Sequence, residues 1–199
     1  LGGHVAIHLH PPVRVLVVHD HQGVVAHMSS IEYASLDNVI EECFSKGISP
    51  LILVLDRITD VRNFGAIART AECAGVHAIV LPSRGAAQIN ADAMKTSSGA
   101  LNFIPVCKED SLIQTIDFLQ NSGLRVVACT EKAKSTIYEI DYKDPIAIIM
   151  GSEEDGITDE IIRKSDEIAK IPQTGQVGSL NVSVAAGVII FETVRQRSI

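Results

Sequence analysis

The fold is decided by the stretch Asp56-Arg57-Ile58-Thr59-Asp60-Val61-Arg62-Asn63-Phe64-Gly65-Ala66-Ile67-Ala68-Arg69. An apolar run at residues 51–55 precedes it and predicts a buried strand, and a helix pattern starts near Asn63. Asp60 or Asn63 can cap this helix, and Gly65 in its first turn allows something to approach closely. Strand, polar loop and helix in this order are typical of an α/β protein.

Arg69 shares a helix face with Gly65, because the two residues are four positions apart. An arginine on a largely apolar helix needs an anionic partner or substrate, since burying an unpaired charge costs several kcal/mol. Two interpretations stay open at this point. Arg69 is either half of a buried ion pair or a ligand for an anionic substrate.

Two later segments have the same organisation, with an apolar run followed by a polar segment. Residues 146–150 are followed by Gly151-Ser152-Glu153-Glu154-Asp155-Gly156, and residues 168–171 lead to Gly178-Ser179-Leu180-Asn181-Val182-Ser183. The acidic turn argues against a phosphate-binding loop, whereas carboxylates suit hydroxyls, amines or a positive centre. Simpler interpretations also exist. Glu153 can be a solvated carboxylate at a helix start, and Ser179 and Asn181 can cap the last helix.

From Pro50 onward strands and helices alternate, which predicts a mostly parallel sheet with helices on both faces. The expected strands are residues 51–55, 77–81, 104–106, 125–129, 146–150 and 168–171. The expected helices are residues 63–74, 91–97, 111–121, 159–165 (capped by Thr158) and 181–196. Ligands of such sheets bind beyond the carboxyl ends of the strands, so the polar segments can converge on one site.

Together the three polar segments resemble the motifs of the SpoU branch of the SPOUT methyltransferases. Those motifs are Asn-x-Gly-x-x-x-Arg, Gly-x-Glu-x-x-Gly and Ser-Leu-Asn-x-Ser, and the match runs from about Pro50 to Arg197. The resemblance implies a deep C-terminal trefoil knot and S-adenosyl-L-methionine as the cofactor. It also implies 2′-O-methylation of RNA ribose by a homodimer with active sites at the subunit interface.

The same resemblance implies roles for individual residues. It makes five residues catalytic: Arg69, Asn63, Glu153, Ser179 and Asn181. It assigns cofactor binding to Thr130, Gly151, Gly156, Ile171, Leu180 and Ser183. Because arginine is a poor base, we favour electrostatic stabilisation and positioning by Arg69 over proton removal.

The substrate is narrowed by the segment Ala87-Gln88-Ile89-Asn90-Ala91-Asp92-Ala93, which resembles the substrate-side loop of the subgroup that methylates a guanosine in 23S rRNA. A tRNA ribose methyltransferase of the same fold and a catalytically inactive RNA-binding module remain alternatives. A Rossmann dehydrogenase is disfavoured, because no Gly-x-Gly-x-x-Gly follows the first strand of this part.

The amino-terminal part differs from the rest. We expect residues 1–46 to be the remnant of an N-terminal RNA-substrate-binding α/β domain with its linker, and residues 47–199 to be the catalytic domain. Residues 21–26 resemble the end of that small domain. Six of the seven histidines lie within residues 4–27, and His8 and His10 share a strand face. We favour surface histidines and expect no metal, since methyl transfer from a sulfonium needs none.

Composition limits the partners and the compartment. A formal charge of −7 gives no overall attraction to nucleic acid, so RNA binding needs a local patch, for which Arg57, Arg62, Arg69 and Arg84 are candidates. The apolar runs are too short to span a bilayer, and no secretory leader is recognised. Four widely spaced cysteines predict free, buried thiols. We therefore expect a cytoplasmic protein without a membrane partner.

Overall fold

The structure is a computed structural model that describes residues 31–198. It contains a six-stranded sheet of order β3-β2-β1-β5-β4-β6, and every pair of neighbouring strands is parallel. The strands are β1 (Leu51–Asp56), β2 (Ala78–Pro82), β3 (Val106–Glu109), β4 (Arg125–Cys129), β5 (Ile146–Gly151) and β6 (Glu167–Ala169). The predicted parallel α/β sheet is therefore confirmed.

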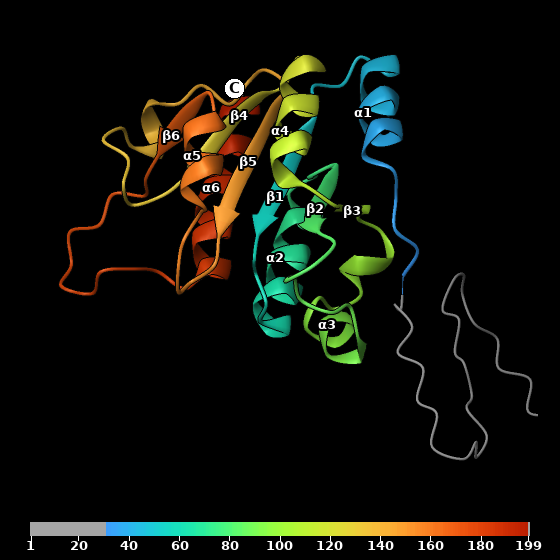
Figure 1. Cartoon of the computed structure of the whole chain (residues 1–199), viewed down its shortest axis with the longest axis horizontal. Helices are drawn as coiled ribbons and strands as arrows, with labels where there is room; N and C mark the ends of the chain where they lie inside the picture. The colour runs from blue at the N-terminus through green and yellow to red at the C-terminus, as the bar shows by residue number, and fades with distance from the viewer. Residues whose placement is uncertain (1–30, 199) are drawn as a thin grey trace, which may run out of the picture.

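Helices cover both faces of this sheet (Figure 1). They are α1 (Leu36–Ser45), α2 (Val61–Cys73), α3 (Ala91–Thr96), α4 (Leu112–Asn121), α5 (Asp159–Lys164) and α6 (Val182–Arg197), with 3-10 turns η1 (Ala100–Asn102) and η2 (Ile137–Glu139). One core lies between the sheet and α1, α4 and α5, and a second between the sheet and α2, α3 and α6. Alternate β1 residues point into each core, because side chains of a strand alternate between faces.

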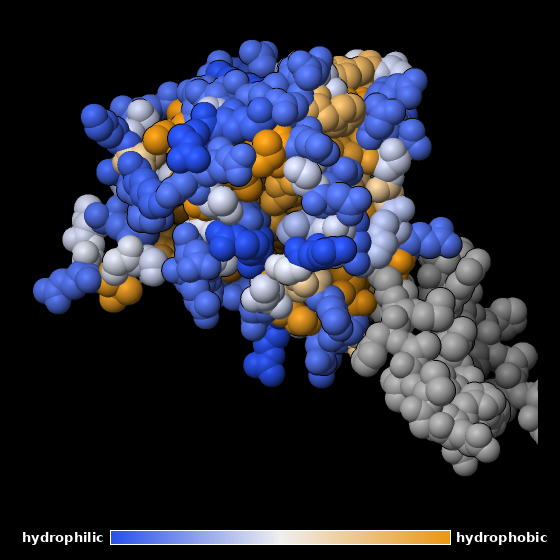
Figure 2. All heavy atoms as spheres, viewed as in Figure 1, coloured by the Kyte–Doolittle hydropathy of each residue, from blue (hydrophilic) through white to orange (hydrophobic). Residues whose placement is uncertain are grey.

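The outer surface differs from these cores. In the view of Figure 2, polar side chains cover most of the face that carries α4 and α5, and apolar surface gathers between α4 and α1. None of the helices in the described part of the chain is long and apolar enough to cross a membrane.

Several predicted boundaries are corrected by local contacts. α2 begins at Val61, two residues early, because the Asp60 carboxylate accepts a hydrogen bond from the backbone N–H of Asn63 at 2.7 Å. Thr158 precedes α5 as predicted, but its hydroxyl makes no cap and donates instead to Asp56 at 2.7 Å. β3 lies later than predicted, after η1, which had no signal in the sequence.

The predicted close approach at Gly65 is confirmed. A Cβ at this position would lie 2.8 Å from the Cβ of Thr96 and 3.0 Å from the backbone oxygen of Ala93, both in α3. The approaching group is therefore another helix. α3 in this way covers the first turn of α2, where Asn63 also lies.

The described part of the amino-terminal region packs on the sheet. Leu36, Ile40 and Cys43 of α1 are buried, and Ala34 forms a parallel bridge with Cys107 beside β3. The histidine pair His8 and His10 and the segment 21–26, which resembles the end of the small domain, lie outside the described residues. The division at residue 46 stays a prediction.

All four cysteines are free thiols, as predicted, but not all of them are buried. Cys43 and Cys107 are buried, Cys129 is partly buried, and Cys73 is exposed at the end of α2.

Candidate active site

The first and second polar segments lie side by side because β1 and β5 are central neighbours. Their register pairs Asp56 with Gly151, so the chain leaves both strands at the same level of the sheet edge. The third segment reaches this edge through α6, which packs against α2. Ordinary parallel topology thus brings together three segments that are distant in sequence.

Glu153 connects the three segments. Its Oε1 atom accepts hydrogen bonds from the side-chain amides of Asn63 at 3.2 Å and Asn181 at 2.7 Å, and from the backbone N–H of Val182 at 3.1 Å. The Asn181 amide also donates to Oδ1 of Asn63 at 3.0 Å. We call these three side chains the carboxamide cluster. Glu153 is therefore a structural centre of the site, and the interpretation of a merely solvated carboxylate is wrong.

Asn181 belongs to this cluster and also caps α6. Its Oδ1 atom accepts from the backbone N–H groups of Ser183 at 2.9 Å and Val184 at 3.4 Å. The amide nitrogen is consequently oriented toward Glu153, because the oxygen is occupied by the helix start. The predicted cap and the predicted site residue coexist in one side chain. Ser179, the other predicted cap, is exposed and has no hydrogen-bond partner among the described residues.

The acidic turn between β5 and α5 has a shape that strongly favours glycine at its two ends. A Cβ at Gly151 would lie 2.1 Å from the carbonyl carbon of Gly156, and Gly156 has φ +66°. Ser152 and Gly156 form an antiparallel bridge across the turn. The turn therefore has one compact conformation, which places Glu153 at its tip.

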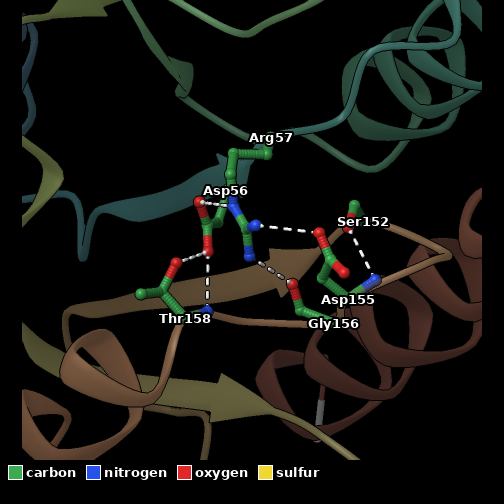
Figure 3. A network of polar contacts seen from close by, with 6 residues as sticks. All are labelled: Asp56, Arg57, Ser152, Asp155, Gly156 and Thr158. Carbon is green, nitrogen blue, oxygen red and sulfur yellow. Dashed lines mark hydrogen bonds and ion pairs between the residues drawn. The ribbon is translucent and has the colours of Figure 1, made fainter.

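A second network fastens this turn to β1, as Figure 3 shows. The Arg57 guanidinium donates to Asp56 at 3.1 Å, to Asp155 at 3.1 Å and to the carbonyl oxygen of Gly156 at 3.2 Å. Hydrogen bonding to Asp56, together with both carboxylate charges, raises the pKa of Arg57 above its ordinary value. The sequence prediction placed Arg57 in a basic patch. In the structure Arg57 instead binds the acidic turn. The sequence could not predict this contact, because it does not show that β1 and β5 are neighbouring strands.

Two cavities border the turn. The larger cavity has a volume of about 720 Å3. Six predicted site residues line it: Thr130, Gly151, Gly156, Ile171, Ser179 and Leu180. Glu153 and Asn181 also line it, whereas Ser183 does not. The smaller, of about 580 Å3, is lined by residues 57–60, Asn63, Gly85, Val182 and the turn residues 152–155. The acidic turn thus forms a wall that the two cavities share.

The larger cavity has both apolar and charged residues in its lining. Cys129, Met150 and Ile189 contribute apolar surface, Glu131 and the turn contribute carboxylates, and Lys170 contributes a cation. Burial raises the pKa of Cys129 to about 12, so its thiol is protonated at neutral pH and is not a nucleophile. This lining suits a ligand with a flat apolar part and a positive charge.

Arg69 stands apart from these cavities. Its side chain is exposed on α2, lines neither cavity, and makes no hydrogen bond or ion pair with any residue of the described range 31–198. The alternative of a buried ion pair is therefore wrong. Its guanidinium is available for an anion that comes from outside the chain.

Residues 172–180 form the least covered wall of the larger cavity. All of them are exposed, and none makes a hydrogen bond within the part of the chain that the structure describes. This loop extends away from the sheet in Figure 1, and Figure 2 shows hydrophobic surface on it, where Val177 is 79% exposed.

The parallel sheet and the cavities at its strand ends define an α/β protein with a small-molecule site beyond the carboxyl ends of its strands. Comparison with known proteins makes the assignment specific. The model of the SpoU rRNA Methylase family matches residues 50–191, and the chain belongs to this family.

Relatives and solved structures agree with this assignment. The chain is 42% identical over 180 residues to the 23S rRNA (guanosine-2′-O-)-methyltransferase RlmB of Pseudomonas aeruginosa, covering 89% of this chain and 72% of that protein. The SpoU methyltransferase AviRb of Streptomyces viridochromogenes, solved with AdoMet, is similar with a TM-score of 0.75 and 25% identity over 85% of this chain and 67% of that one. An RNA 2′-O ribose methyltransferase gives a TM-score of 0.70 and 28% identity, over 76% of this chain and 58% of its own.

Proposed function

We propose that this chain catalyses transfer of a methyl group from S-adenosyl-L-methionine to a ribose 2′-hydroxyl of RNA. The observation that carries the proposal is the carboxamide cluster, in which one residue of each motif meets at the border of the larger cavity. The relatives' printed activities support the same reaction.

The larger cavity fits this cofactor. Its volume of about 720 Å3 lies in the usual range for small-molecule sites, and its carboxylates suit a donor that carries a sulfonium and an ammonium group. We propose that Thr130, Gly151, Gly156, Ile171 and Leu180 border the bound molecule, and that Ser183 supports Asn181 from behind. When bound, S-adenosylmethionine supplies an electrophilic methyl group on its sulfur.

The residues of the chain position and stabilise the attacking sugar. Glu153 orients Asn63 and Asn181 at the junction of the two cavities. We propose that the smaller cavity admits the target nucleotide and that its ribose reaches the larger cavity, where Ser179 lies. We further propose that Arg69 binds the neighbouring phosphate or the developing alkoxide. A guanidinium stabilises negative charge without giving up its own proton, because its ordinary pKa is about 12 or higher.

The substrate that we propose is a guanosine in 23S rRNA, methylated in the cytoplasm. The support is the identity of about 40% with relatives named for that reaction. The exposed Arg62, Arg69 and Arg84 offer a local positive patch on a chain of formal charge −7.

We also propose a homodimer in which Arg69 serves the partner's site. Val184 and Phe191 are 53% and 50% exposed and lie seven residues apart, hence on one face of α6, and Leu180 just before the helix is 40% exposed. A second copy would cover this apolar face. Since α2 packs against α6, such a contact would place Arg69 beside the neighbouring subunit.

A deep trefoil knot formed by the carboxyl-terminal strands and α6 is part of the proposal. The family membership supports it. An experimental backbone that straightens into an unknotted line when its two ends are drawn apart would contradict it.

Calorimetry tests the cofactor assignment. The purified chain should bind S-adenosylhomocysteine and should not bind NAD. Binding of NAD alone would overturn the proposal, because the cavity would then serve a different chemistry.

Mixed dimers test the shared site. Arg69→Ala and Glu153→Ala should each be inactive, whereas an equal mixture after subunit exchange should regain about a quarter of wild-type turnover, since half the dimers would hold one intact site. Exchange is verified by mass spectrometry. An inactive mixture with verified exchange would place Arg69 in the site of its own chain.

A further inference from the structure

Arg57 adopts an unusual backbone conformation immediately after β1. Its φ is +55°, in the left-handed region that residues with a Cβ rarely occupy. Such a conformation persists only where surrounding contacts hold it, and it is often found next to functional sites.

The contacts that hold Arg57 join the end of β1 to the acidic turn. All three of its nitrogen groups donate: Nε to Asp56, Nη1 to Asp155 and Nη2 to the carbonyl oxygen of Gly156. The other oxygen of Asp56 accepts from the N–H and hydroxyl of Thr158, at 2.8 and 2.7 Å. In Figure 3 these side chains bridge the ends of β1 and β5. We call the group of Asp56, Arg57, Asp155 and Thr158 the arginine latch.

The latch holds the base of the turn, whereas the carboxamide cluster holds its tip. Glu153 at the tip is bound to Asn63 and Asn181, while Asp155 and Gly156 at the base are bound to Arg57. Residues 152–155 line both cavities. A shift of this turn would therefore change both cavities at the same time.

We infer that Arg57 is a positioning residue that fixes the wall between the cofactor cavity and the nucleotide cavity. It acts through the turn, and this role deepens the proposed function and rests on it. Loss of the latch weakens cofactor binding and slows methyl transfer, although Arg57 itself receives no methyl group and moves no proton.

The test uses Arg57→Gly, because glycine adopts φ +55° without strain and the variant removes the guanidinium alone. S-adenosylhomocysteine affinity should fall by about tenfold, and kcat for RNA methylation should fall as well. Both are measured at a temperature at which the variant is fully folded, because loss of the partner of the buried Asp56 also lowers stability. Arg163→Ala, which removes an exposed arginine on α5, is the matched control and should bind like the wild type.

A double-variant cycle adds a readout that a general loss of stability would not give. Asp155→Asn should weaken binding, and Arg57→Gly combined with Asp155→Asn should weaken it little further, because both remove one interaction. Additive losses would overturn the inference. So would Arg57→Gly with unchanged S-adenosylhomocysteine affinity and a raised KM for RNA with weaker salt dependence, which would make Arg57 a phosphate ligand.

Two different outcomes separate the role of Arg57 from the proposed function. A wild-type chain that binds S-adenosylhomocysteine and methylates RNA, with an Arg57→Gly variant that does both equally well, contradicts the latch only. A wild-type chain that does neither contradicts the proposed function, and the latch with it.

Discussion

The acidic turn at residues 152–156 and the loop at residues 172–180 border the same cavity, but they are held very differently. The turn is bound at its tip by the carboxamide cluster and at its base by Arg57. The loop is exposed along its whole length and makes no hydrogen bond among the described residues. One wall is therefore formed before a ligand arrives, and the other is free to adapt to it.

Arg57 and Arg69 differ in the same way as the turn and the loop. The Arg57 side chain donates hydrogen bonds to Asp56, Asp155 and Gly156. The Arg69 side chain is exposed and has no partner in the described chain. Groups that define the shape of a site are best held rigidly, while a group that binds an incoming anion must keep its donors free. Substitutions in the rigidly held groups and in the free groups should therefore have different effects on binding and turnover.

Replacement of the free arginine should have the largest effect. Arg69→Ala should lower kcat on the order of 10²–10³-fold, because charge stabilisation at the reacting oxygen is lost. S-adenosylhomocysteine affinity should stay close to normal, since Arg69 lines neither cavity. Steady-state kinetics and calorimetry measure both. Loss of cofactor affinity would assign Arg69 to the fixed wall instead.

A methyl group added to the fixed wall should be costly. Gly151→Ala places a Cβ 2.1 Å from the backbone of Gly156, so the turn must shift, at a cost of about 1–3 kcal/mol in unfolding free energy. Denaturant titration measures the loss. Gly175→Ala in the exposed loop is the control, because no atom lies within 4 Å of its Cβ, and it should be neutral. Equal effects of the two changes would remove the distinction between the walls.

Weakening the carboxamide cluster should reduce both binding and turnover. Glu153→Gln keeps an acceptor oxygen but loses its charge, so we expect about tenfold weaker S-adenosylhomocysteine binding. Glu160→Gln, an exposed carboxylate on α5, should have no effect. Wild-type affinity in Glu153→Gln would mean that the cluster does not shape the cavity.

A side-chain change in the exposed loop should do little. If Leu180 meets the cofactor through its backbone, Leu180→Ala should change affinity by about twofold or less, as expected for a surface substitution. Calorimetry is again the measurement. A tenfold loss would show that the loop side chain is an anchor, and the two walls would then contribute alike.

Acidification should affect the scaffold before the site. His77 accepts a hydrogen bond from the backbone N–H of Leu51 at 3.0 Å, at the end of β1 remote from the cavities, and burial lowers its pKa. Below about pH 6.5 the unfolded chain binds a proton that the folded chain does not, so stability should decrease as pH falls. His77→Gln should flatten this part of the stability profile. An unchanged profile would contradict the role of His77.

Sequence patterns predicted most of the strands and helices because apolar runs, caps and glycines act locally. The position of the polar segments after strand ends also predicted that Asn63, Glu153 and Asn181 lie near one another. The hydroxyl of Thr158 and the guanidinium of Arg57 were assigned wrongly, since their partners are 102 and 98 residues away across neighbouring strands. Only the adjacency of β1 and β5 makes those contacts foreseeable, and strand order does not follow from local pattern.

The most direct measurement is nucleoside mass spectrometry of unmodified 23S rRNA after incubation with the purified chain and isotope-labelled S-adenosylmethionine. We expect labelled 2′-O-methylguanosine with the wild type, and none above background with Arg69→Ala despite normal cofactor binding. Absence of any ribose-methylated nucleoside with the wild type, or equal labelling by the variant, would contradict it.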